Sequence, residues 1–291
     1  MKRVYSMLCA AILSAILLGA CTMNGKGNKD AKCRMQVATF NLRMDTPYDS
    51  LDAWPNRKEM VKSLVRFHDF DIFGTQEGFK HQLDGILELG NYAYIGAGRD
   101  DGQEAGEHSA IFYKKERFEV LEKGDFWFSE TPDVPGKGWD ATCCNRICSW
   151  GKFKDLESGK VFYFFNSHYD HQGVVARRES SKLLLKKIKE IAGEKAIVFA
   201  TGDFNAVPTD EPITILAADG LLKDSYEMTQ EPPYGTVGTF SSFHLDAPMK
   251  NRIDYVWVTD GIEVEKYGVL NEQQYGHFPS DHFPVMLKVV F

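Results

Sequence analysis

The sequence predicts an α/β domain in which two mainly antiparallel sheets pack face to face and helices cover the outside. Two observations support this fold class. Short runs rich in β-branched and aromatic residues recur along the chain, and amphipathic helical segments separate several of them. No linker rich in Pro or Gly divides the chain after Lys32, so we expect residues 34–291 to form one domain.

Strands are predicted where a short apolar or alternating run is bounded by turn residues. They are expected at residues 35–41, 71–77, 92–95, 109–113, 118–121, 147–153, 161–168, 196–200, 253–258, 264–269 and 285–290. The third, fourth and fifth of these runs are interpreted as a meander. The sixth and seventh are interpreted as a hairpin around the turn at 155–160.

Helices are predicted where apolar residues recur at helical spacing. They are expected at residues 55–68, 81–89, 174–191 and 212–218. The first begins with Pro55, and Gly90 and Gly220 are expected to terminate the second and the last. The apolar face of the first helix is expected to contain Met60, Leu64, Val65 and Phe67.

Composition limits the classes of function that the chain can serve. Of its 291 residues, 43% are hydrophobic and 26% are charged, which is typical of a globular protein and excludes a disordered or fibrous one. The net charge is −7, whereas proteins that bind nucleic acid nonspecifically usually present a basic face. The charge therefore argues mildly against a nucleic-acid substrate, although a carboxylate metal site would itself add negative charge.

The N-terminus has the layout of an export signal. Lys2 and Arg3 precede an apolar or small-residue run at 7–20 that is too short to span a bilayer comfortably. The run ends in Leu-Gly-Ala-Cys, which resembles the bacterial lipobox. The resemblance implies that Cys21 carries a lipid.

We therefore expect residues 1–20 to be a signal peptide and residues 21–33 to be the lipid-attachment cysteine followed by a polar tether. The exported protein would be anchored to a bacterial membrane, in the periplasm or at the cell surface. The alternative is a signal peptide cut at the same place, with Cys21 incidental. No other segment is long and apolar enough to cross a membrane, and no protein partner is predicted.

The cysteines of the exported part do not indicate a metal site. Cys143, Cys144 and Cys148 lack the paired Cys-x-x-Cys spacing and a nearby His, so zinc is not expected. Together with Cys33 they are interpreted as buried thiols. A disulfide is an open alternative in an exported protein, and its pairing cannot be derived from the sequence.

Polar residues that buried strands rarely tolerate lie at the ends of several predicted strands. They are Asn41, Glu77, His168, Asp170, Asp203, Asn205, Asp254, Asp281 and His282. A carboxylate at the end of a buried strand costs on the order of several kcal/mol unless it is paired or holds a metal. One such residue would be interpreted as a hydrogen-bonded core group or a turn cap. Their recurrence, in residue types suited to Mg²⁺ and phosphate, indicates a functional site.

Six segments that contain these residues are similar, in order, to the motifs of the endonuclease/exonuclease/phosphatase family. The segments are Thr39-Phe40-Asn41-Leu42, Thr75-Gln76-Glu77, Asn166-Ser167-His168-Tyr169-Asp170, Gly202-Asp203-Phe204-Asn205, Arg252-Ile253-Asp254-Tyr255 and Ser280-Asp281-His282. This family includes pancreatic-type deoxyribonuclease, abasic-site endonuclease, neutral sphingomyelinase and inositol-polyphosphate phosphatases. The resemblance spans residues 35–291 and implies a four-layer α/β sandwich with the site at one rim of the sheets.

The resemblance also implies a divalent cation, Mg²⁺ or alternatively Mn²⁺. Glu77 would bind the ion directly, and Asn41 and Asp281 would complete or support its ligands. Carboxylate and amide oxygens are the ligands that such hard cations prefer.

The remaining motif residues would carry out the chemistry. Asp203 would orient and deprotonate the attacking water, and Asn205 and His168 would hold the phosphoryl oxygens. His282, held by Asp254, would stabilise the transition state or assist the leaving group. These roles suit phosphoryl transfer, which depends mainly on charge neutralisation and in-line positioning.

Four further residues are assigned supporting or substrate-binding positions. The resemblance implies that Glu107 pairs with His168, and a solvent-facing loop acid is the alternative. For Arg146, beside the expected rim, a structural salt bridge is favoured over a contact to substrate phosphate. Asp170 is expected to support the turn of its motif or the outer ligands of the metal, and His171 to line the mouth of the cleft.

The substrate stays open, because one fold can serve many phosphate esters. The favoured interpretation is a metal-dependent phosphoesterase that hydrolyses a small or lipid-linked phosphodiester or phosphomonoester outside the cytoplasm. The first alternative is a secreted nuclease, for which the sequence shows no obvious run of Lys and Arg. The second is a non-catalytic surface lipoprotein that binds its target, and the presence of all the site residues argues against it.

Overall fold

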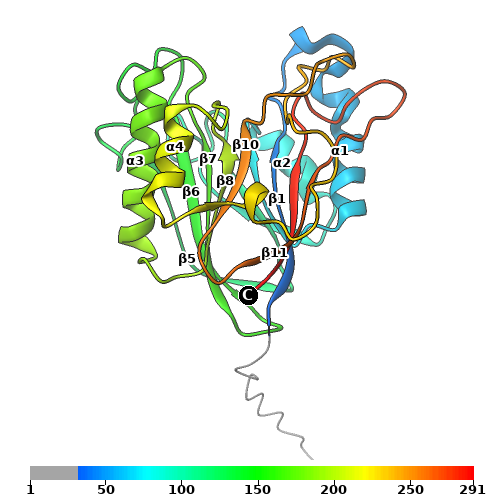
Figure 1. Ribbon diagram of the computed structural model, residues 1–291. Helices are drawn as coiled ribbons and strands as arrows, with labels where there is room; N and C mark the ends of the chain where they lie inside the picture. Colours follow the sequence, from blue (N-terminus) through cyan, green and yellow to red (C-terminus); the bar gives the residue numbers. More distant parts are fainter. Residues whose placement is uncertain (1–31) are drawn as a thin grey trace, which may run out of the picture.

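The computed structural model describes residues 32–291, and these residues form the four layers that the sequence predicts. Two sheets face each other, with α1 and α2 on the outer face of one and α3 and α4 on the outer face of the other (Figure 1). The helices are α1 (Trp54–His68), α2 (Lys80–Leu87), α3 (Val174–Ile191), α4 (Glu211–Asp219), the short α5 (Ser225–Met228) and the 3-10 helix η1 (Pro47–Asp52).

Both sheets follow the same plan within the described chain. The first contains, in spatial order, β11 (Glu263–Val269), β12 (Val285–Val290), β1 (Arg34–Asn41), β2 (Ile72–Gln76), β4 (Ile111–Lys114) and β3 (Tyr92–Ile95). The second contains β5 (Phe118–Trp127), β6 (Ile147–Asp155), β7 (Val161–His168), β8 (Val198–Asp203), β10 (Asp254–Val258) and β9 (Lys223–Asp224). Each has one central parallel pair, β1–β2 or β7–β8, and its other pairs are antiparallel. The prediction of two mainly antiparallel sheets is confirmed.

Three apolar clusters fill the spaces between the four layers. One lies between the sheets and includes Phe164. A second joins α1 to the first sheet through residues such as Val61 and Phe73, and a third joins α3 to the second sheet through residues such as Leu184 and Trp257. Because both faces of each sheet are covered, the central strands are apolar on both sides, which explains their continuous apolar runs.

The predicted meander is wrong in one respect. Strands β3 and β4 pair with each other, but β5 belongs to the second sheet. β5 extends to Trp127 and pairs with β6 over almost its whole length, so it forms a longer hydrogen-bonded ladder in the second sheet than β3 and β4 form with each other. Local pattern cannot distinguish these partners, because the choice depends on residues far along the chain.

The predicted apolar face of α1 is also partly wrong. Phe67 is 82% exposed and Met60 is only partly buried. Each residue advances about 100° around a helix, so both residues lie roughly a third of a turn away from the face centred on Val61. Arg57, with its guanidinium over the ring of Trp54, takes part in the buried face instead.

The predicted signal peptide and the lipid-attachment cysteine lie outside the described residues. Within residues 32–291, no helix has both the length and the apolar composition that a membrane crossing requires.

The carboxyl ends of the four central strands meet at one rim of the molecule. β1 packs against β8 and β2 against β7, and the two strands of each parallel pair run in the same direction. Arg34, where β1 begins, lies at the opposite end of the domain, beside the C-terminus (Figure 1). The residues that end these strands form the candidate site.

Candidate active site

The four central strands each bring one polar side chain to the rim. Asn41 ends β1, His168 ends β7 and Asp203 ends β8, and all three are buried. Glu77 follows β2 in the left-handed backbone conformation, with a φ of 63°. This conformation is unfavourable for a residue other than glycine, and it persists where the surrounding structure holds it, often at functional sites.

Asn41 connects the two carboxylates. Its Nδ2 donates to Oε1 of Glu77 and to Oδ2 of Asp203, each at 3.0 Å, and its Oδ1 accepts from the backbone N–H of Arg43 at 2.9 Å. Glu77 also accepts from the backbone N–H of Met44 at 3.1 Å. The loop after β1 therefore holds the ends of β2 and β8 together across the two sheets.

His282 lies between two acids. Its Nδ1 is 2.9 Å from Oδ2 of Asp254, the predicted partner, and its Nε2 is 3.7 Å from Oδ2 of Asp203. Burial disfavours the charged ring, but these carboxylates outweigh it and raise the pKa of His282 well above its ordinary value. Burial and the charge of Asp254, which lies opposite Asp203 in the β8–β10 ladder, raise the pKa of Asp203 to about 7.

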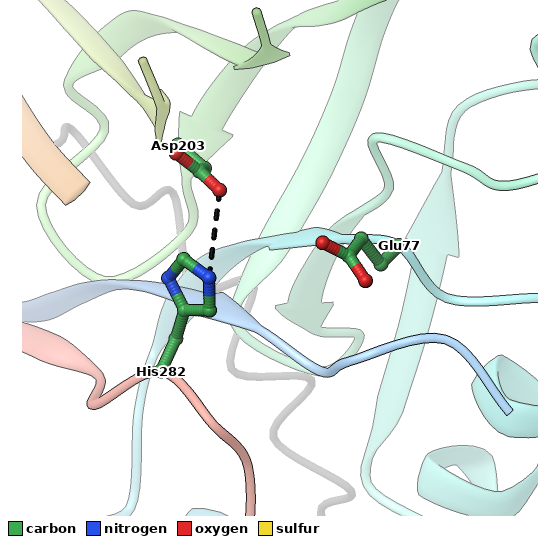
Figure 2. Close-up of side chains that lie close together, drawn as sticks. All are labelled: Glu77, Asp203 and His282. Carbon is green, nitrogen blue, oxygen red and sulfur yellow. Dashed lines mark ion pairs between the residues drawn. The ribbon is translucent and has the colours of Figure 1, made fainter. Parts of the chain in front are cut away.

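Glu77, Asp203 and His282 form a cluster in which the two carboxylates can hold a metal ion. One ligand atom from each lies within 4.8 Å of the others, and the three side chains converge on one space (Figure 2). The carboxylates of Glu77 and Asp203 supply oxygen ligands, which fit a hard cation such as Mg²⁺ or Mn²⁺, and the amide of Asn41 holds them together through its Nδ2. Burial raises the pKa of Glu77, but His282 and the hydrogen bonds from Asn41 and Met44 hold it below its ordinary value.

Asp281, a predicted ligand, lies beside this cluster rather than within it. Burial raises the pKa of Asp281 to about 6. The charge of His282 opposes this rise, and the charge of Glu77 adds to it. Its Oδ2 is 3.9 Å from Nε of Arg43, and the preceding Ser280 donates to the carbonyl of Asn41 at 2.7 Å. Asp281 is therefore placed to support the ion and the loop that carries His282.

His168 and Asn205, which are predicted to hold phosphoryl oxygens, both line the cleft. Nε2 of His168 is 3.6 Å from Oδ2 of Asp203. Burial, together with the positive charges of Arg146 and Arg99, lowers the pKa of His168 well below its ordinary value, so the ring is neutral. Asn205 donates to the carbonyl of Tyr169 at 3.0 Å and lines the cleft.

Glu107 is buried and faces a different partner from the one expected. Its Oε2 accepts from Nη1 of Arg99 at 2.6 Å, whereas Nδ1 of His168 is 3.9 Å away, which is beyond hydrogen-bonding distance. Burial raises the pKa of Glu107 to about 7, although the charge of Arg99 opposes the change. Glu107 is thus part of the site, and its main partner is Arg99.

Arg146 forms the structural ion pair that is favoured for it from the sequence and also lines the cleft. Its Nε is 3.4 Å from Oδ2 of Asp170, and its Nη2 donates to Nδ1 of His171 at 2.8 Å. Asp170 also accepts from the backbone N–H groups of residues 172 and 173, so it supports the turn after β7. Nη1 of Arg146 is buried and has no hydrogen-bond partner among residues 32–291.

A buried polar layer lies directly beneath the site, between the sheets. Oδ1 of Asn166 accepts from Nε2 of Gln76 at 2.7 Å and from Oγ1 of Thr201 at 2.9 Å, and Gln76 also donates to Thr39 at 3.0 Å. These residues precede the site residues by one or two positions along the same strands. Gly74 makes room for the layer, because a Cβ there would lie 2.2 Å from Oδ1 of Asn166.

The site residues open into a cleft of about 490 Å³. Its lining includes the cluster of Glu77, Asp203 and His282. The other residues that matter for the chemistry are His168, His171, Asn205, Asp281, the arginines Arg43, Arg99 and Arg146, and the aromatic residues Phe240 and Phe243. A larger, shallow hollow between α3 and α4 is lined by lysines such as Lys182 and Lys186 and lies away from these groups. The chemistry therefore belongs to the rim cleft.

Sequence reasoning did not identify Arg43, Arg99 or the aromatic residues as part of the site. Arg43 directly follows the segment Thr39-Phe40-Asn41-Leu42, and this position was a signal for including it. Arg99 lies in a loop between β3 and β4 with no motif around it, and only the folded chain brings it to Glu107 and the cleft.

The cysteines correct one prediction. Cys33 and Cys148 are buried free thiols, as expected, but Cys143 and Cys144 form a disulfide with each other and line the cleft. The bond joins two adjacent residues, and no spacing rule predicts such a pair. The interpretation of these two as buried thiols is therefore wrong.

Comparisons with known proteins agree with this geometry. A family model described as the endonuclease/exonuclease/phosphatase family matches residues 38–282. The solved structure of a protein of that family from Bacteroides thetaiotaomicron is similar, with a TM-score of 0.86 and 45% identity, over 90% of this chain and 99% of that one. A mannosyl-6-phosphatase from the same species is also similar, with a TM-score of 0.84 and 46% identity, over 88% of this chain and 100% of that one.

One curated relative is an exoribonuclease subunit of the CCR4-Not complex from Aspergillus niger. It is 24% identical over 309 residues, which cover 79% of this chain and 46% of that protein. The chain thus spans about half the length of this relative.

Proposed function

Because the chain belongs to the endonuclease/exonuclease/phosphatase family and is a hydrolase of phosphoester bonds, we propose that its reaction is the metal-dependent hydrolysis of a sugar phosphomonoester outside the cytoplasm. The observation that carries the proposal is a small cleft in which Glu77, Asp203 and His282 lie beside three arginines. The similarity to a mannosyl-6-phosphatase supports the sugar phosphate as the substrate class.

The arginines favour a monoester over a diester. Arg43, Arg99 and Arg146 line the cleft, and Nη1 of Arg146 and Nε of Arg99 are buried without hydrogen-bond partners in the described part of the chain. A phosphomonoester has a second ionisation near neutral pH and carries about −1.5 to −2 charge, which is more than a diester carries. Guanidinium donors bind such a group through charge-assisted hydrogen bonds.

The size of the cleft favours a small substrate. A volume of about 490 Å³ is within the usual range of small-molecule sites. The net charge of −7 is unfavourable for nonspecific contacts along a nucleic acid. The nuclease alternative is favoured by the exoribonuclease relative, which is less similar than the sugar phosphatase.

The residues of the cleft can perform the two proton transfers. Asp203, whose pKa burial and Asp254 raise to about 7, is suited to accept the proton of the attacking water. His282 carries a proton near neutral pH and can donate it to the leaving oxygen of the sugar. Neutral His168 and Asn205 are placed to contact the phosphoryl oxygens. A divalent cation bound through Glu77 and its neighbours would neutralise charge on those oxygens.

The location outside the cytoplasm rests on the export signal and on the lipobox ending at Cys21. A lipid there would be connected to the domain through the first residue of β1, and the site residue Asn41 is the last residue of this strand. Replacing Cys21 by Ser should release the protein from the membrane fraction, and a protein that stays there would contradict the anchor.

Substrate assays test the reaction. The wild type and Asp203→Asn would be incubated with mannose 6-phosphate, bis(p-nitrophenyl) phosphate, plasmid DNA and RNA, each with Mg²⁺ and with EDTA. We expect phosphate release from the sugar monoester that is lost with EDTA and in the variant. Asp133→Asn removes a carboxylate that is 89% exposed and serves as the matched control. Cleavage of DNA or RNA without phosphate release from the sugar would replace the proposal by the nuclease alternative.

A further inference from the structure

A disulfide forms part of the cleft surface. Cys143 and Cys144 are bonded to each other and line the same cleft as Glu77, Asp203 and His282. Cys143 is exposed and Cys144 is partly exposed, so the bonded pair contributes surface rather than core. The proton transfers and phosphate contacts proposed above do not involve it.

The disulfide is an apolar element in a mostly charged cleft. Its sulfur atoms carry no hydrogen to donate and are at most weak acceptors, and sulfur is polarisable. Carboxylates, guanidinium groups and imidazole rings make up much of the remaining lining. A sugar phosphate presents its charged group to such residues, whereas the C–H groups of its ring gain from contact with an apolar surface.

The loop that carries the disulfide is held in place from both sides. Oδ1 of Asp140 accepts from a backbone N–H in the first turn of α3 at 2.7 Å, and Thr142 donates to Oε1 of Gln172 at 2.6 Å. On the other side, Nδ2 of Asn145 donates to the carbonyl of Arg99 at 3.2 Å. These contacts do not include the sulfur atoms, so the loop can keep its place when the cysteines are replaced.

We propose that the Cys143–Cys144 disulfide is a specificity-determining surface that contacts the carbon skeleton of the leaving group, the sugar, while the arginines and acids of the same cleft bind the phosphate. The inference rests on the proposed function, because it assigns the sugar to one wall of the same cleft. Covering some 50 Å² of apolar surface corresponds to about a tenfold difference in affinity.

The test compares an ester that has a sugar ring with one that does not. KM and kcat would be measured for mannose 6-phosphate and for ethyl phosphate with the wild type and with Cys143→Ala/Cys144→Ala. We expect KM for mannose 6-phosphate to rise about tenfold, with kcat changed less than twofold and turnover of ethyl phosphate unchanged. Val134→Ala, an exposed apolar residue of the preceding loop, is the control and should leave both substrates unaffected.

Equal loss of activity on both esters would overturn the proposal, because it would show that the disulfide only positions neighbours such as Arg146. An unchanged KM for mannose 6-phosphate would also overturn it. If the double variant fails to fold, the same comparison is made with wild-type protein before and after reduction by a phosphine, and the reduced protein must show the same split between the two esters.

Two further outcomes keep this inference separate from the proposed function. The tryptic peptide 138–146 should resist alkylation until the protein is reduced, and its alkylation without reduction would overturn the disulfide proposal alone. A wild type that releases phosphate from neither ester would overturn the proposed function, and the assignment of the sugar would fall with it.

Discussion

Nδ1 of His282 lies 2.9 Å from Oδ2 of Asp254, and this contact places the other ring nitrogen 3.7 Å from Asp203. Asp254 and Asp203 are themselves opposite each other in the β8–β10 ladder. Like charges directly opposite in a ladder are unfavourable, and the protonated ring offsets this repulsion. The charge of Asp254 therefore raises the pKa of both Asp203 and His282.

Replacing Asp254 by Asn should lower kcat about 10- to 100-fold. The ring of His282 would lose the carboxylate that orients it and keeps it protonated, so proton donation to the leaving oxygen would weaken. The measurement is kcat at saturating mannose 6-phosphate, with the melting temperature as a check on folding. Asp260→Asn, an exposed acid just after β10, is the control. Full kcat in Asp254→Asn would mean that His282 does not depend on this partner.

A divalent cation should stabilise the fold, and Asp203→Asn should weaken this effect. The charge of Glu77 raises the pKa of both Asp203 and Asp281, and a bound cation would relieve this repulsion. At a concentration of 100 times Kd, a cation adds about 2.7 kcal/mol to the free energy of unfolding. We expect the melting temperature of the wild type to rise with Mg²⁺. With EDTA, Asp203→Asn should melt above the wild type, because it lacks one of the buried charges.

Melting curves of both proteins with Mg²⁺ and with EDTA measure this. An equal rise on adding Mg²⁺ in wild type and Asp203→Asn would show that Asp203 does not contribute to the ion site. No rise in either protein would contradict a site formed by this cluster.

Replacing Gly74 by Ala should destabilise the protein by roughly 3 kcal/mol, through overpacking and the loss of buried hydrogen bonds. The new Cβ would lie 2.2 Å from Oδ1 of Asn166 and 2.6 Å from Oγ1 of Thr201, so the polar layer beneath the site must move. Urea unfolding measures the change. Gly136→Ala, where no atom approaches the Cβ closer than 4.0 Å, should be nearly neutral. A stable Gly74→Ala with normal activity would show that the layer can rearrange at little cost.

Asp155 should make the stability of the protein depend on pH. It is buried, with Oδ1 2.9 Å from Nε of Arg117. Burial raises the pKa of this carboxyl, but hydrogen bonds from Ser158 and Arg117 outweigh it and hold the pKa below its ordinary value. A carboxyl with a depressed folded pKa adds stability above its unfolded pKa, and this stability is lost as the pH falls through the folded pKa.

Asp155→Asn should therefore lower the free energy of unfolding by about 3 kcal/mol at pH 7. The gap from the wild type should shrink as the pH falls below about 4. Urea unfolding at a series of pH values measures both. Glu157→Gln changes an acid that is 74% exposed and 4.0 Å from Arg117, and it should have no such effect. A gap that stays constant down to pH 2 would contradict a role for the charge of Asp155.

Some parts of the site follow from local sequence, and others do not. The prediction that His282 pairs with Asp254 agrees with the structure, because each residue belongs to a motif whose strand or loop is recognisable on its own. Asp281 is predicted to complete or support the ligands of the ion, and in the structure the ligand atoms that lie together with Glu77 come from Asp203 and His282. That outcome depends on how the two sheets are packed, since Glu77 and Asp203 come from different sheets.

Local sequence predicts most of the strands, most helix boundaries and the polar residues at the strand ends, because alternation, helical spacing and terminating residues act over a few neighbouring positions; it misses the two-residue β9 and the full length of β5. The tertiary structure decided the partner of β5, the contact of Arg99 with Glu107 and the presence of Cys143 and Cys144 in the cleft. Each of these depends on which distant segments pack together. The protonation of Asp203 and His282 was likewise decided by folding, since their pKa values respond to burial and to charges brought from other strands.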